Sequence, residues 1–237
     1  MSLEKIIVAL DTDMKEEAIE IIHKLGDRIN YYKVGSVLFT RYGPELVKEI
    51  KKFGQGKQVF LDLKYHDIPN TVANAIKQAM IYGVDMLTIH TIGGYQMMRA
   101  AVEACGKEQK SKPPVILGVT VLTSMKTTDL REVGVNRVVE SQVKKMTKLG
   151  MRAGIGGVVC SGQEIELVRK VVGEDKLIVV PGIRLASGDK GDQKRVVTPK
   201  DAVLKGADYL VMGRPIIKAN DPQKILDLIE QELNGVS

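Results

Sequence analysis

Short runs of mainly apolar residues recur along the whole chain, at intervals that leave room for a helix between them. Each run is four to seven residues long and is bounded by polar residues or glycine. Near-continuous apolar character is typical of strands buried on both faces of a parallel sheet. The pattern predicts eight strands, over Ile6–Leu10, Tyr31–Val34, Val59–Leu63, Met86–Ile89, Val115–Val121, Gly157–Cys160, Leu177–Val180 and Tyr209–Met212.

The segments between these runs carry apolar residues at helical spacing, and several begin with proline at a first helical position. They predict helices over Lys15–Leu25, Pro44–Phe53, Thr71–Tyr82, Tyr95–Cys105, Asn136–Leu149, Gln163–Val172, Pro199–Lys205 and Pro222–Leu233. Strands and helices that alternate eight times indicate an α/β fold, a (β/α)8 TIM barrel, which we expect to form one catalytic domain over residues 1–237. An open doubly wound sheet is the alternative, and the regular eightfold alternation favours the barrel.

Composition narrows the possible functions. The chain has 237 residues and a formal charge of +6, but no Trp and only 4% aromatic residues. A platform that stacks single-stranded nucleic acid needs several aromatic side chains, and no block of five like charges forms a basic tail. We therefore expect a mostly solvated basic surface, and neither nucleic acid nor membrane as a partner. The two cysteines form no CxxC pair and no signal segment or membrane span is visible, which favours a reduced, cytoplasmic protein.

The third predicted strand carries charged residues where a barrel strand has no solvated face. Asp62 and Lys64 alternate along it and therefore share a face, and Lys33 lies at a similar height on the preceding strand. Burying a charge is costly unless it is paired, so we expect an alternating array of lysines and carboxylates, with Asp67 just beyond the strand. A lysine ammonium held in such an array can donate a proton to a carbanion-like carbon. No cluster of acidic residues and histidines accompanies the array, so we expect no metal.

A second group of residues follows the seventh and eighth strands. Gly213 and Arg214 begin a helical stretch after strand eight, and barrels commonly bind phosphate at this corner. Arg184 follows strand seven and is expected to face the same corner. Between them, residues 186–195 form a polar loop that we interpret as a lid, with Gln193 as a polar contact to a phosphorylated substrate.

The motifs of the chain resemble those of the bacterial orotidine 5'-monophosphate decarboxylase family. The resemblance covers nearly the full chain, and the ten-residue segment DLKYHDIPNT at 62–71 is highly specific. Further matching segments are VALD at 8–11, YKVG at 32–35, VTVLTS at 119–124, VPGIR at 180–184 and VMGRPI at 211–216.

This resemblance implies cofactor-free decarboxylation of orotidylate to UMP by a homodimer. It implies a catalytic tetrad of Lys33, Asp62, Lys64 and Asp67, with Lys64 as proton donor to C6 and Asp62 beside the departing carboxylate. Whether Asp62 repels that carboxylate or only fixes the lysines stays open. Asp67 and Thr71 would reach the neighbouring subunit's site. The implied substrate-binding residues are Asp11, Lys33, Asp62, Leu63, Lys64, Tyr65, His66, Asp67, Ile68, Pro69, Asn70, Thr71, Thr123, Ser124, Pro181, Arg184, Gln193, Gly213 and Arg214.

Other functions are compatible with parts of this pattern. A Mg²⁺-dependent sugar-phosphate decarboxylase or aldolase of the same barrel superfamily could share an Asp-x-Lys-x-x-Asp motif. Lys33 in place of an acidic ligand and the IPNT continuation at 68–71 argue against it. A phosphate-binding barrel without catalytic activity is a further alternative, and the complete charged array argues against that one.

Overall fold

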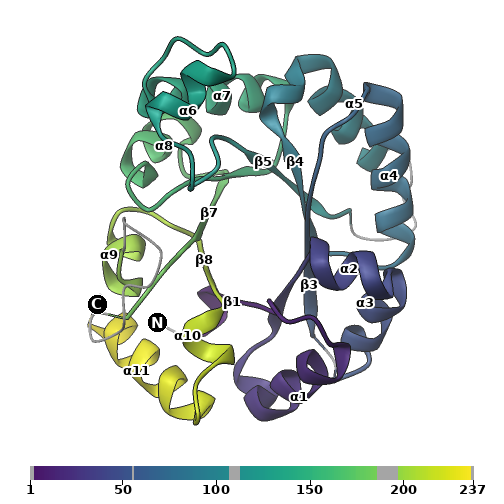
Figure 1. Ribbon diagram of the computed structural model, residues 1–237, viewed down its shortest axis with the longest axis vertical. Helices are drawn as coiled ribbons and strands as arrows, with labels where there is room; N and C mark the ends of the chain where they lie inside the picture. Colours follow the sequence, from purple (N-terminus) through teal and green to yellow (C-terminus); the bar gives the residue numbers. More distant parts are fainter. Residues whose placement is uncertain (1–2, 55, 107–112, 186–196, 236–237) are drawn as a thin grey trace.

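Eight parallel strands close into a barrel in the computed structural model of the protein, which describes residues 3–54, 56–106, 113–185 and 197–235 (Figure 1). Each strand pairs with the next, and β1 also pairs with β8, so the predicted barrel is confirmed and the open sheet is wrong. The strands are β1 (Ile6–Ala9), β2 (Tyr31–Gly35), β3 (Gln58–Tyr65), β4 (Met86–His90), β5 (Val115–Val119), β6 (Gly157–Val159), β7 (Leu177–Pro181) and β8 (Tyr209–Met212).

Helices surround the barrel, and the eight predicted ones are present with ends that differ by up to four residues (Figure 1). They are α1 (Lys15–Leu25), α3 (Pro44–Lys51), α4 (Pro69–Ile81), α5 (Gly94–Gly106), α7 (Val139–Ala153), α8 (Ile165–Val172), α9 (Pro199–Leu204) and α11 (Pro222–Asn234). Two short helices, α2 (Ser36–Tyr42) and α6 (Thr127–Glu132), were not predicted, whereas α10 (Arg214–Ile217) is the helical stretch expected after strand eight. Two turns or fewer give too few residues for an apolar period to be visible. Within the described residues, no helix is both long and apolar enough to cross a membrane.

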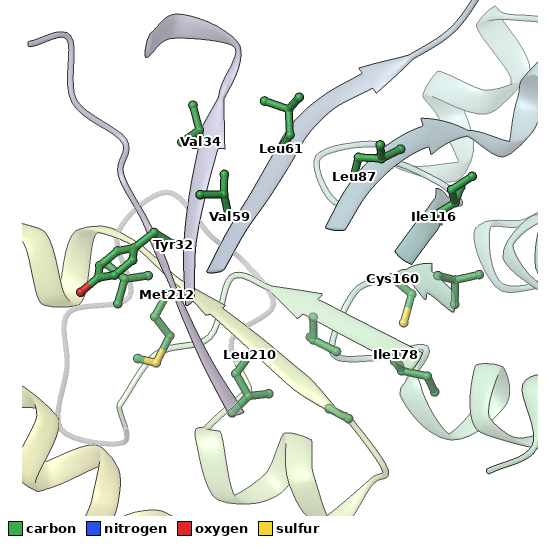
Figure 2. Close-up of a cluster of buried hydrophobic side chains, with 14 of the residues drawn as sticks. Tyr32, Val34, Val59, Leu61, Leu87, Ile116, Cys160, Ile178, Leu210 and Met212 are labelled. Atoms are coloured by element: carbon green, nitrogen blue, oxygen red, sulfur yellow. The ribbon is translucent and has the colours of Figure 1, made fainter. Parts of the chain in front are cut away.

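Alternation along the strands divides the core into two layers. One set of side chains faces the helices, and Figure 2 shows members of it on neighbouring strands, including Tyr32, Leu61 and Leu87. A smaller set fills the barrel interior. It consists of Ile7, Ala9, Tyr31, Phe60, Met86, Leu117, Val179 and Val211. Because side chains repeat every second residue, the interior residues determine which later residues on each strand face the mouth of the barrel.

Two aspartates connect strands and helices in the same way at the end of the barrel where the strands begin. Asp85 immediately precedes β4, and its Oδ2 accepts hydrogen bonds from Lys51 Nζ (2.6 Å) and from the backbone N–H of Val59 on β3 (2.7 Å). Asp208 immediately precedes β8, and its Oδ2 accepts from Arg169 Nη2 (2.6 Å) and from the backbone N–H of Ile178 on β7 (2.6 Å). Each carboxylate therefore joins a strand start to the preceding strand and to a helix.

Substitution Asp208→Ala tests how much these contacts stabilise the fold. It removes the ion-pair partner of the largely buried Arg169 and the acceptor for the Ile178 N–H, so we expect a loss of about 2 kcal/mol in the free energy of unfolding. Urea unfolding measures it, with exposed Asp175→Ala as the control, for which we expect a change within about 0.5 kcal/mol. Equal stabilities of the two variants would contradict this role of Asp208.

Candidate active site

The polar residues at the mouth of the barrel continue the inward-facing columns of the strands. Five interior residues are each followed, two positions later, by a residue of the mouth. The pairs are Ala9 and Asp11, Tyr31 and Lys33, Phe60 and Asp62, Met86 and Thr88, and Val211 and Gly213. The period of two therefore carries each column from the apolar interior into a polar layer. This is why the charged residues converge although they belong to strands far apart in the sequence.

Three of these side chains, Asp11, Lys33 and Asp62, form a continuous chain of opposite charges together with Lys64. Lys33 Nζ lies 3.0 Å from Asp11 Oδ1 and 3.8 Å from Asp62 Oδ2. Lys64 Nζ lies 2.9 Å from both carboxylate oxygens of Asp62. The side chains of Lys33 and Asp62 are only 11% and 15% exposed, so each is stabilised by its charged neighbours rather than by water.

Strand register explains how Lys33 reaches this array. Its backbone pairs with Phe60, and the residue opposite Asp62 is Gly35. Lys33 therefore starts two residues below the level of Asp62, where the sequence interpretation placed it, and spans the difference with its long side chain. A Cβ at Gly35 would lie 3.2 Å from Lys33 Nζ, so glycine leaves the space through which the ammonium passes.

Lys64 has an unusual backbone. Its φ is +51°, a conformation uncommon outside glycine and the only such case among the non-glycine residues of the described chain. The pairing of β3 with β4 is interrupted between Leu61 and Tyr65 at this point. The Lys64 N–H donates to Thr88 Oγ1 (2.9 Å), and the same hydroxyl donates to Asp62 Oδ1 (2.9 Å).

A cavity of about 270 Å³ joins this array to the phosphate corner predicted from the sequence. On the β1–β3 side it is lined by the array. On the β7–β8 side it is lined by Arg184 and Arg214, together with Pro181, Gly182, Gly213 and, after β5, Thr123. Both arginines thus face the same cavity, as predicted. A second cavity of about 290 Å³ adjoins the array on the side of Ser36 and Val37.

Close packing shapes the phosphate corner. A Cβ at Gly213 would lie 3.1 Å from Asp11 Oδ2 and 3.3 Å from Ala9 Cβ, so a larger residue would push the start of α10 away from the array. Arg184 is buried, and its backbone N–H donates to the carbonyl of Val197 (3.3 Å). The predicted lid at 186–195, including Gln193, lies outside the described residues.

The segment that follows β3 lies exposed at the rim of the barrel. Residues 66–71 are all exposed, and Asp67 Oδ1 accepts a hydrogen bond from the N–H of Ile68 (2.6 Å). In one chain, therefore, the second carboxylate of the array is Asp11, which contacts Lys33, and not Asp67.

Comparison with known proteins agrees with this geometry. A family model described as Orotidine 5'-phosphate decarboxylase / HUMPS family matches residues 4–229. The chain belongs to this family. It is 46% identical to the orotidine 5'-phosphate decarboxylase of Pelobacter propionicus, over 97% of this chain and 95% of the relative. It is 49% identical to that of Idiomarina loihiensis, over 94% of each. The crystal structure of the enzyme from Lactobacillus acidophilus superposes with a TM-score of 0.85 at 37% identity, over 98% of this chain and 99% of that one.

Membership of the orotidine 5'-phosphate decarboxylase family confirms the resemblance drawn from the sequence. The structure brings Asp11, Lys33, Asp62 and Lys64 into direct contact and places Arg184 and Arg214 across the cavity. Of the other implied residues, Leu63 and Tyr65 are half-buried on β3 and Ser124 is exposed next to Thr123. The sequence interpretation missed Thr88, although a hydroxyl inside the otherwise apolar run at 86–89 was a signal for it.

His90 stands beside the array without adding a second positive charge to it. Its ring centroid lies 5.7 Å from that of His66. Burial lowers the pKa of His90 below its usual value, and the nearby His66 and Lys64 lower it further. Asp62 acts in the opposite direction but does not outweigh these causes, so the neutral imidazole is favoured at pH 7.

This assignment predicts the NMR titration of His90. Its midpoint should lie below the ordinary histidine value of about 6.5. Substitution Lys64→Ala removes a positive charge, so the pKa of His90 should rise but stay below normal, because burial remains. A midpoint at or above the ordinary value in the wild-type protein, or no change in Lys64→Ala, would contradict the assignment.

Proposed function

We infer that this chain decarboxylates orotidine 5'-monophosphate to UMP in pyrimidine biosynthesis, as a single barrel domain of the cytoplasm. The observation that carries the inference is the array of Asp11, Lys33, Asp62 and Lys64 at one side of a cavity that has Arg184 and Arg214 at the other. The curated relatives at 44–49% identity are all named orotidine 5'-phosphate decarboxylase. That agreement gives the Mg²⁺-dependent sugar-phosphate alternative no support.

The cavity suggests how the nucleotide lies. We propose that Arg184, Gly213 and Arg214 hold the phosphate, with Gln193 of the loop after β7 as a further contact. Asp11 and Lys33 hold the ribose hydroxyls, and Thr123 and Ser124 lie at the pyrimidine. This orientation directs C6 and its carboxylate towards Asp62 and Lys64.

The proposed reaction needs only groups that the chain supplies. The bond from C6 to the carboxylate breaks, CO2 leaves, and the electron pair stays on C6. That pair has no π system to delocalise into, so the transition state requires a fixed electrostatic environment. The Lys64 ammonium stabilises the developing negative charge and then donates a proton to C6, which gives UMP. Water returns a proton to the amine.

The donor set favours chemistry without a metal or cofactor. Ammonium groups do not ligate cations, and that of Lys33 occupies the position between Asp11 and Asp62 that a divalent ion bridging the two carboxylates would need. Distant contacts to the phosphate supply binding energy that offsets the cost of placing the substrate carboxylate beside Asp62.

We further propose that two copies of the chain share the site as a homodimer. Asp67 and Thr71 are exposed at the rim of the barrel, available to a neighbouring copy. Exposed apolar side chains also follow each of the strands β2 to β5, at the same end of the barrel, and exposed apolar groups are typical of an interaction surface. They are Val37, Ile68, Ile92 and Leu122. The cavity beside Lys33 and Lys64 has room for a carboxylate from the partner.

The first test is Lys64→Ala, with UMP formation from orotidylate followed by ultraviolet absorbance. We expect robust turnover by the wild-type protein and a decrease of roughly 10⁴-fold or more in the variant, since it lacks both the proton donor and the cation at C6. An unchanged melting temperature controls for folding. Near-wild-type turnover in Lys64→Ala would refute the proposed role.

The dimer is tested by Ile68→Asp against Ile81→Asp. Both isoleucines are 67% exposed, but Ile81 is at the opposite end of α4 from Ile68. Sedimentation should give twice the 26.0 kDa chain mass for the wild-type protein and for Ile81→Asp. Ile68→Asp should shift the protein towards the single-chain mass and lower its activity. A wild-type protein of single-chain mass would contradict the shared site.

A further inference from the structure

We propose that Thr88 is a positioning residue of the decarboxylation site, because its hydroxyl fixes the geometry of both Asp62 and Lys64. The proposal rests on the function inferred above. Thr88 lies in the middle of β4, its side chain is fully buried, and it does not line the substrate cavity. Its effect on the reaction would therefore pass through the two charged residues that it contacts.

Strand pairing explains why this position matters. Leu61 pairs with Leu87, and the next pair is Tyr65 with Ile89. Between these pairs β3 advances by four residues and β4 by two, so residues 62–64 of β3 bulge opposite the single residue Thr88. The bulge removes the regular ladder partner of the Lys64 N–H, and Thr88 Oγ1 replaces it at 2.9 Å.

The hydrogen-bond directions are fixed by proton count. A hydroxyl has one proton, and the lone pair that accepts the Lys64 N–H leaves that proton for Asp62 Oδ1, at 2.9 Å. Asp62 Oδ1 in turn accepts from Lys64 Nζ at 2.9 Å. The result is a closed ring in which the backbone and the ammonium of Lys64 are both held through one hydroxyl and one carboxylate.

This ring accounts for the left-handed backbone of Lys64. Such a conformation persists in a non-glycine residue only when the surroundings impose it. Without the hydroxyl, Lys64 can relax towards ordinary strand geometry, and its ammonium and the Asp62 carboxylate would both move. Small displacements of catalytic groups lower kcat more than they weaken binding of a nucleotide whose phosphate is held elsewhere.

The experiment compares Thr88→Val, which keeps the shape but removes the hydroxyl, with Thr88→Ser, which keeps the hydroxyl. We expect Thr88→Val to lower kcat about 10- to 100-fold while the KM for orotidylate and the Kd for UMP change less than about threefold. Thr88→Ser should recover kcat to within about fivefold of wild type. The matched control is Thr91→Val, since Thr91 is equally buried and its hydroxyl donates to the Val119 carbonyl, away from the array. Thr91→Val should lower the free energy of unfolding as much as Thr88→Val does, while its kcat stays at the wild-type value.

The outcomes separate this proposal from the proposed function. A wild-type protein without turnover overturns the function, and the role of Thr88 with it. An active wild-type protein with kcat unchanged in Thr88→Val overturns only the role of Thr88. So does an equal loss in Thr88→Ser, because shape and not the hydroxyl would then be responsible. If Thr88→Val does not fold, Thr88→Ala provides the same comparison with Thr88→Ser.

Discussion

The site depends on the mutual stabilisation of charges that could not be buried singly. Lys33 lies between Asp11 and Asp62, and Asp62 lies between Lys33 and Lys64, so each inner member has an opposite charge on both sides. A buried charge left without its partner is strongly destabilising. The array is therefore rigid as a unit, and the surrounding backbone is adapted to it. Gly35 leaves room for Lys33, Gly213 leaves room for Asp11, and the bulge in β3 aims Lys64.

In the proposed reaction, the barrel separates the groups that perform the chemistry from those that hold the nucleotide. Strands β1 to β3 supply the charged array, whereas β7 and β8 lead into the two arginines across the cavity. A rigid ring of strands keeps the two sets at a fixed separation, so contacts made at the phosphate can position the pyrimidine against the array. Binding energy from a distant part of the substrate is then available for the reacting centre. On the side of the array, burial lowers the pKa of His90, which disfavours a further positive charge near Lys64.

Much of this arrangement was predictable from the sequence because it follows from periodicity. The period of two placed Asp62 on the inward face, and the alternation of eight strands with eight helices indicated the barrel. Three features were not predictable, since they depend on register and not on period. Lys33 enters the array from two residues lower, the bulge gives Lys64 its left-handed backbone, and the bulge makes Thr88 a partner of both Asp62 and Lys64. Helices of one or two turns, such as α2 and α6, were too short for an apolar period to be visible.

The central claim is that this array of side chains, without a metal or cofactor, performs the decarboxylation. The most direct measurement is the turnover of orotidylate by the purified wild-type protein in excess EDTA, with and without added Mg²⁺. We predict the same rate of UMP formation under both conditions, because the Lys33 ammonium occupies the position between Asp11 and Asp62 that a cation would need. Loss of activity in EDTA that Mg²⁺ restores would contradict the account.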